Sequence, residues 1–155
     1  MRTIILPVDA SSCSDSVVQE IIKLSKTTGP ADLHLVNVQP RIFTESALMF
    51  TDASKIDTYY YEQATRALAS AENALKSAGL AYTAHRLVGP VAETIVAKAK
   101  ELNADGIVMG THGHGRLSGM LLGSVSNKVL HLAPMPVTLV RGEPPIDFGG
   151  RLSAT

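Results

Sequence analysis

The chain has 155 residues, of which 45% are hydrophobic, and its 14 basic residues balance its 14 acidic ones. This length favours one domain with a buried core, and a neutral chain offers no electrostatic attraction to nucleic acid or to an anionic membrane. The single cysteine, Cys13, excludes an internal disulfide and a four-cysteine zinc site. We expect a cytoplasmic protein, because no signal-peptide pattern and no stretch of roughly 20 apolar residues is present.

Short apolar runs alternate with helical patterns along the chain. The runs predicted as strands are residues 3–8, 33–38, 81–88, 105–109 and 137–140. Helical periodicity follows the first run as far as Gly29-Pro30, covers residues 61–78, follows Pro90 and covers residues 124–132. Residues 39–60 lack a clear period and are predicted to form a functional, mobile or interacting segment.

Strands that alternate with helices are typical of an α/β fold with a doubly wound parallel sheet. Ligands of such folds bind beyond the carboxyl ends of the strands. Asp9 follows the first predicted strand, Val38 ends the second, and Gly110 follows the fourth. If the first and fourth strands are neighbours, these three positions meet at one edge of the sheet. Asp9 then either caps the helix that follows it or contacts a ligand.

The glycine-rich stretch GTHGHGRLSGMLLGS, residues 110–124, lies between the fourth strand and the last helix. A strand, a glycine-rich loop and a helix start form an arrangement that binds phosphate in many proteins. Gly110 and Gly113 allow a positive φ and a close backbone approach to a phosphate, although glycines there also suit a simple turn. Ser124 and Ser126 are ordinary capping residues, and the same hydroxyls are candidates for phosphate contacts.

The glycines are spaced as Gly110, two residues, Gly113, nine residues and Gly123-Ser124. This spacing is similar to the nucleotide-binding signature of the ATP-binding branch of the universal stress protein A family. The segment DASSCS, residues 9–14, resembles the family's Asp-Gly-Ser-x-x-Ser, with Ala10 in place of the usual glycine. Residues 33–38, 89–95 and 136–140 resemble further family segments in the same order.

The resemblance implies a Rossmann-like, adenine nucleotide alpha hydrolase-like fold whose five strands have the order 3-2-1-4-5. It implies a universal stress protein domain over residues 1–141 and a homodimer through residues 137–140. The prolines and glycines of residues 142–155 predict a flexible tail. ATP, with or without Mg²⁺, is the implied ligand. The implied ATP-binding residues are Pro7, Asp9, Val38, Met109, Gly110, Gly113, His114, Gly123, Ser124, Val125 and Ser126.

The same resemblance implies individual roles within this set. Asp9 would accept a hydrogen bond from the ribose, the Val38 backbone would contact the adenine edge, and Pro7 would bound the base. The amides of Val125 and Ser126 would face the phosphates. His114 stands where the family often has a basic residue.

Catalytic machinery is not predicted. No Lys-Ser or Lys-Thr pair follows the final glycine, and no acidic cluster is present to hold Mg²⁺. His112 and His114 lack nearby carboxylates for a metal site and are expected to face solvent. We therefore favour an ATP-binding regulatory module in stress response. The alternatives are a slow ATPase or phosphotransferase, and a nucleotide-independent dimeric interaction protein.

Overall fold

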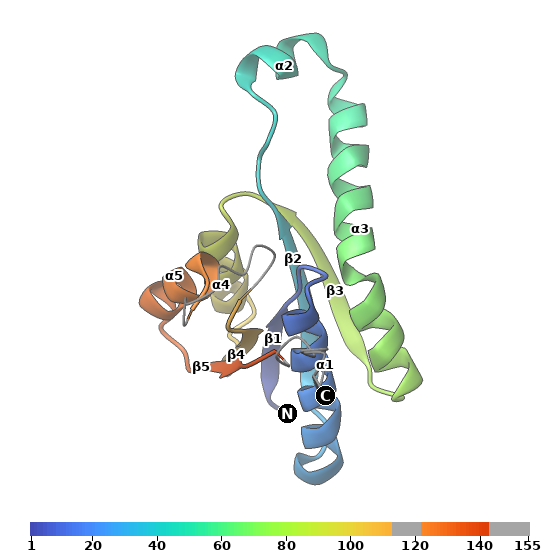
Figure 1. Cartoon of the computed structure of the whole chain (residues 1–155), viewed down its shortest axis with the longest axis vertical. Helices are drawn as coiled ribbons and strands as arrows, with labels where there is room; N and C mark the ends of the chain where they lie inside the picture. Colours follow the sequence, from blue (N-terminus) through green and yellow to red (C-terminus); the bar gives the residue numbers. More distant parts are fainter. Residues whose placement is uncertain (113–121, 143–155) are drawn as a thin grey trace, which may run out of the picture.

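The computed structural model describes residues 1–112 and 122–142, and the statements below refer to these residues. The first half of the chain contains β1 (Thr3–Pro7), α1 (Ser12–Thr28), β2 (Asp32–Gln39), α2 (Glu45–Phe50) and α3 (Ala53–Ser77). The second half contains β3 (Tyr82–Val88), α4 (Val91–Glu101), β4 (Gly106–Gly110), α5 (Ser124–Leu132) and β5 (Val137–Val140). Figure 1 shows these elements with their labels.

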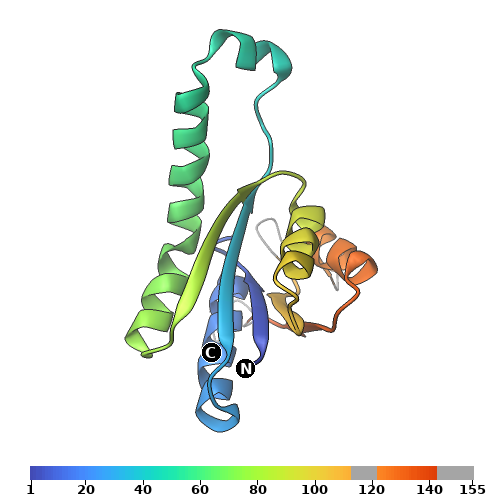
Figure 2. The ribbon, with the colours of Figure 1, turned by 180° about the vertical axis from the view of Figure 1, so that it is seen from behind.

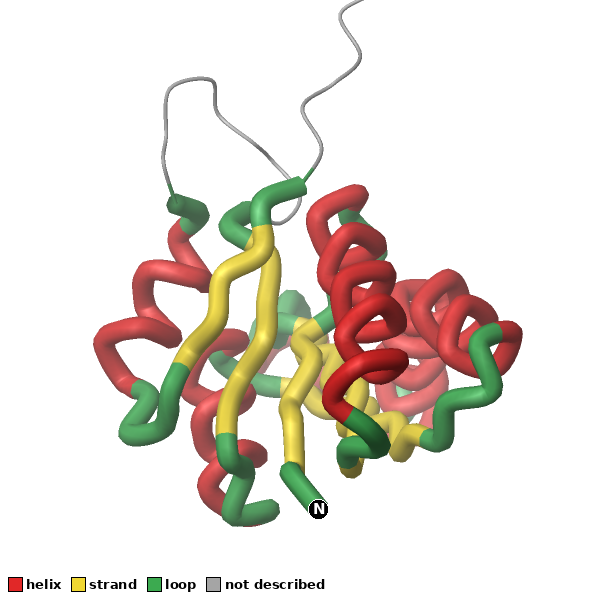
Figure 3. Tube along the Cα trace, turned by 90° about the horizontal axis from the view of Figure 1, so that it is seen from below, coloured by secondary structure: helices red, strands yellow, loops and turns green. Residues whose placement is uncertain are grey.

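The five strands form one parallel sheet in the order β3-β2-β1-β4-β5. The predicted fold class and strand order are therefore confirmed. Helices cover both faces of the sheet (Figure 3). Because side chains alternate along a strand, Ile5 packs on the face covered by α4 and α5, while Leu6 packs on the face covered by α1 and α3. The carboxyl ends of β1, β2 and β4 consequently lie between two packed layers.

The predicted elements agree closely with the structure except between residues 39 and 60. There α2 is a separate short helix, and α3 begins at Ala53, earlier than the predicted residue 61. The Asp52 carboxylate caps α3 by accepting a hydrogen bond from the Ser54 amide. Only Ile56 and Tyr60 are buried in the first turns of α3. One buried residue per turn is too weak a pattern to reveal a helix from the sequence.

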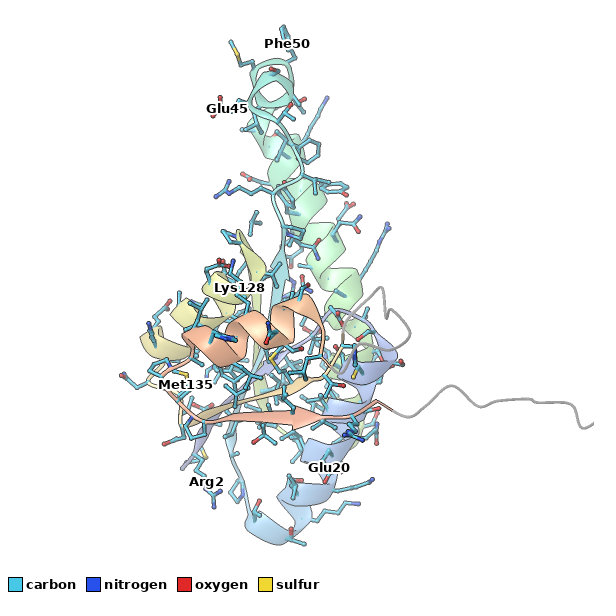
Figure 4. All side chains as sticks on the ribbon, turned by 60° about the vertical axis from the view of Figure 1, so that its left-hand side comes forward. Arg2, Glu20, Glu45, Phe50, Lys128 and Met135 are labelled. Atoms are coloured by element: carbon cyan, nitrogen blue, oxygen red, sulfur yellow. The ribbon has the colours of Figure 1, made fainter. Side chains whose placement is uncertain are left out.

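The loop after β2, helix α2 and the first turns of α3 project from the body of the molecule, as both ribbon views show (Figures 1 and 2). At about 1.5 Å per residue, the 25 residues of α3 span about 37 Å. Edge-to-face contacts among Phe43, Tyr59 and Tyr60 hold the base of this projection. Met49 and Phe50 are exposed at its tip, where Figure 4 shows Phe50. None of the described helices is both long and apolar enough to span a membrane.

Candidate functional site

A cavity of about 710 Å³ lies at the carboxyl ends of the central strands. Its walls come from the ends of β1, β2 and β4 and from the amino-terminal turns of α4 and α5. The lining residues that matter for the site are Pro7, Asp9, Ser14, Asn37, Val38, Gln39, Met109, Gly110, His112, Gly123, Ser124, Val125 and Ser126. The cavity thus lies where a parallel sheet is expected to bind its ligand.

The turn after β1 holds Asp9 in a small network of hydroxyl groups. Asp9 Oδ1 accepts a hydrogen bond from the Ser14 hydroxyl at 2.8 Å and another from the Ser11 amide at 3.0 Å. The N-cap of α1 is Ser11, whose side chain accepts from the Ser14 amide. Ala10 makes the turn with a φ of 63°, in the left-handed region that favours glycine. Asp9 therefore organises the turn and lines the cavity, but it does not cap the helix.

The end of β2 presents backbone groups on the side of β1. In a parallel sheet, the N–H and C=O of one residue point to the same neighbouring strand, and those of the next residue point to the strand on the other side. The Gly89 amide donates to the Gln39 carbonyl at 3.0 Å, so Gln39 faces β3. The Val8 amide donates to the Val36 carbonyl at 2.9 Å, so Val36 faces β1. Val38, two residues beyond Val36, also directs its N–H and C=O away from β3.

The amino terminus of α5 forms another wall of the cavity. Gly123 is its N-cap, and no side chain bonds to this end of the helix among the described residues. The first bond within the helix joins the Asn127 amide to the Gly123 carbonyl at 3.0 Å. The amides of Ser124, Val125 and Ser126 precede it, as expected for a helix start. Such amides, aligned with the helix dipole, favour an anionic ligand.

Ser126 connects this helix to the end of β4. Its side chain is buried, and its hydroxyl donates a hydrogen bond of 2.9 Å to the Gly110 carbonyl. The hydroxyl hydrogen is thereby used within the protein. A phosphate oxygen accepts hydrogen bonds, so a contact with Ser126 would come from its amide in this conformation.

Gly110 does not adopt the positive φ that glycine allows. Among the described glycines, positive φ values occur at Gly29, Gly79 and Gly89. Gly110 instead lies against the first turn of α1, where an added Cβ would be 2.8 Å from Cys13 Sγ and 2.9 Å from Cys13 Cβ. Glycine at the end of β4 is therefore required by close packing against a buried cysteine.

The structure brings most of the predicted site residues to this one cavity. The lining includes Pro7, Asp9, Val38, Met109, Gly110, Gly123, Ser124, Val125 and Ser126. Gly113 and His114 lie outside the described residues. The predicted tail, 142–155, is described only at Gly142.

Sequence analysis missed several residues that line the cavity. Ser14, the last serine of the DASSCS segment, lines the cavity, and no role was predicted for it. Asn37 and Gln39 flank Val38 and also line the cavity. The apolar pattern of this strand did not predict a site role for either residue. His112 was expected to face solvent, yet it lines the cavity, and its Nδ1 lies 3.0 Å from Thr111 Oγ1.

The charge around the cavity is low. Asp9 is the only carboxylate among the described lining residues. No group of three or more histidine, cysteine, aspartate or glutamate side chains in residues 1–112 and 122–142 is placed to hold a metal ion. The site therefore offers hydrogen-bond donors for an anion at α5 and an acceptor for hydroxyl groups at Asp9.

Comparisons with known proteins agree with this architecture. The universal stress protein YxiE of Bacillus subtilis is 31% identical over 144 residues, which cover 88% of this chain and 97% of that protein. Universal stress proteins of Mycobacterium tuberculosis and Mycobacterium bovis are 57% identical over 42 residues. This match spans 27% of the chain but only 14% of each relative.

Solved structures share the fold. The structure of hypothetical protein MJ0577 superposes with a TM-score of 0.79 at 25% identity, covering 92% of this chain and 97% of that chain. A universal stress protein in complex with cAMP has a TM-score of 0.62 at 22% identity, covering 91% and 97%. The universal stress protein of Archaeoglobus fulgidus in complex with dAMP has a TM-score of 0.62 at 21% identity, covering 90% and 96%.

A model of a whole protein family also matches most of the chain. The model of the universal stress protein family matches residues 1–141, which include every helix and strand described above. The chain belongs to the universal stress protein family.

Proposed function

We propose that this protein binds ATP in the cavity at the carboxyl ends of β1, β2 and β4 and acts as a nucleotide-dependent regulatory module in stress response. The observation that supports this proposal is the convergence of Asp9, the Val38 backbone and the amino terminus of α5 on one cavity. Its volume of about 710 Å³ lies in the range of small-molecule sites, about 300–1,000 Å³. The cAMP and dAMP complexes of the matched universal stress proteins support an adenine nucleotide as the ligand class.

The nucleoside would occupy the side of the cavity next to β1 and β2. The Val38 N–H and C=O match an adjacent acceptor and amino group on the edge of adenine. Pro7 and Met109 would bound the base with apolar surface. Asp9, held by Ser14, would accept a hydrogen bond from a ribose hydroxyl.

The phosphates would lie at the amino terminus of α5. The amides of Ser124, Val125 and Ser126 and the helix dipole favour their charge. Gly113 and His114 remain proposed contributors from the preceding loop. Mg²⁺ commonly binds through substrate phosphates with one or two carboxylates. Asp9 is the only described carboxylate on the cavity wall, so an ion entering with ATP would depend mainly on the phosphates.

Calorimetry with ATP, AMP and adenosine tests the phosphate half through a matched pair of variants. Ser124→Pro removes the Ser124 amide and hydroxyl, whereas Ser124→Ala removes only the hydroxyl. Proline suits the first helical position, and Gly123 before it has the extended φ and ψ of −72° and 161° that proline requires. We expect Ser124→Pro to weaken ATP about tenfold relative to Ser124→Ala, the low end for a charge-assisted bond. Adenosine affinity should be equal in both.

The proposal fails if the purified protein binds no adenine nucleotide at millimolar concentration. Mass spectrometry of ligand released from the protein provides an independent check, with ATP as the expected species. Phosphate release that disappears in Asp9→Ala would instead favour the slow ATPase. Activity that survives this change would indicate a contaminant.

We also propose a homodimer through β5. Within residues 1–112 and 122–142, β5 pairs with β4 only and forms the edge of the sheet, so its outer backbone groups could pair with a second copy. Leu130 and Leu132 of the preceding helix, α5, are exposed hydrophobic residues. Light scattering at micromolar concentration should give twice the monomer mass, and a monomer would contradict this proposal.

A further inference from the structure

The pairing of β1 with β2 ends in an unusual way. The two strands pair in register from Thr3 with Asp32 to Pro7 with Val36, and the Val8 amide adds one further bond to the Val36 carbonyl. The parallel pattern would next join the Val38 amide to the Val8 carbonyl. That carbonyl instead accepts a hydrogen bond of 2.7 Å from the side-chain amide of Asn37.

The Asn37 carboxamide is fixed at both ends. Its Nδ2 donates to Val8 and its Oδ1 accepts from Gln39 Nε2 at 2.8 Å. The opposite orientation would place two acceptors, Oδ1 and the Val8 carbonyl, against each other, so the contacts define it. Asn37 is 3% exposed, so losing this bond would leave a buried carbonyl without its donor.

We propose that Asn37 is a positioning residue of the adenine subsite. By occupying the Val8 carbonyl, it ends the β1–β2 ladder before Val38 and leaves the Val38 N–H directed to the cavity for the base. This inference rests on the proposed nucleotide function and adds a determinant of base specificity to it. An N–H beside a C=O pairs with the N1 acceptor and N6 amino group of adenine. Guanine presents the opposite pattern, an N1–H donor and an O6 acceptor.

The variant Asn37→Leu tests the idea, because leucine has the same branching at Cγ but no hydrogen-bond donor. The orphaned Val8 carbonyl should then recruit the Val38 amide into the ladder. Ile21→Val is the control, since it alters the buried core of α1 away from the cavity. Both variants are compared at a temperature well below their unfolding midpoints.

Two readouts separate positioning from simple stability. We expect Asn37→Leu to weaken adenosine, AMP and ATP by the same factor, about tenfold, because the lost contact is to the base they share. The preference for ATP over GTP should fall with it. Ile21→Val should leave both quantities unchanged. Unchanged affinities in Asn37→Leu, with a lower unfolding temperature, would overturn the positioning role.

Amide hydrogen exchange at Val38 gives the ligand-independent readout. In the nucleotide-free protein this amide should exchange readily, and in Asn37→Leu it should gain protection of at least tenfold. Protection already present in the wild-type protein would overturn the proposal even if nucleotides bind. If Val38 behaves as expected but the wild-type protein binds no nucleotide, the ladder mechanism stands. The proposed function, and with it the specificity role, then fails.

Discussion

Substitution of Gly110 by alanine tests the packing at the end of β4. The new Cβ would lie 2.8 Å from Cys13 Sγ, 2.9 Å from Cys13 Cβ and 3.3 Å from the His112 carbonyl oxygen. Cys13 is buried, and its sulfur also lies 3.8 Å from Thr111 Oγ1 and 3.7 Å from the Val140 carbonyl, so it has little room to move. Overpacking of this kind costs about 1–3 kcal/mol. For a chain of this size, the unfolding temperature should fall by about 2–4 °C per kcal/mol.

Circular dichroism during thermal and urea unfolding measures this loss. Cys13→Gly removes both crowded atoms, so the double variant should recover about 1–2 kcal/mol relative to the sum of the single changes. Gly142→Ala is a matched control, because its Cβ would approach the same sulfur only to 3.2 Å and should cost less. Unchanged stability together with weaker ATP binding in Gly110→Ala would refute the packing explanation. Glycine would then serve the approach of a ligand.

Three further predictions concern single side chains. Ala10→Gly should raise the free energy of unfolding by about 0.5–1 kcal/mol in urea titrations, because it relieves a φ of 63°, and a decrease would show that the turn is unstrained. Ser126→Ala should lower it by about 1 kcal/mol through loss of the 2.9 Å bond to Gly110, and unchanged stability would contradict that bond. Burial, and then the charge of nearby His34, lowers the pKa of His85 below its ordinary value of 6.5. The unfolded chain therefore binds more protons at His85 than the folded protein does. The contribution of neutral His85 to the free energy of unfolding is complete above pH 6.5 and is lost as pH falls through the lower pKa of the folded state. His85→Gln should flatten that decrease in urea titrations at several pH values, and an unaltered decrease would assign it to other groups.

Hydrophobic periodicity was sufficient for most of the fold. The strand Val137–Val140 and the helix Ser124–Leu132 were predicted at the bounds they have in the structure. Periodicity failed at α3, where the first turns project from the body and only Ile56 and Tyr60 are buried. A helix that packs along one half of its length carries only half of its pattern.

The candidate site was predicted in position better than in detail. Asp9, Val38 and Gly110 could be placed together because they lie at the carboxyl ends of strands of one parallel sheet. The role of Asn37 could not be predicted, since it depends on the Val8 carbonyl, which lies close only after β1 and β2 pair. No cavity position was predicted for His112, because the cavity forms only where the end of β4 and the start of α5 come together.

The sequence by itself determined the family, the alternation of strands and helices, and which strand ends carry polar or glycine residues. These properties follow from local periodicity and from motifs whose spacing is contained in the chain. Only the tertiary structure decided that Gly110 accommodates Cys13, that the Ser126 hydroxyl is bonded to Gly110, and that Asn37 replaces Val38 in the ladder. Each of these depends on contacts between segments far apart in the chain, and the direction of a side chain is set by those contacts.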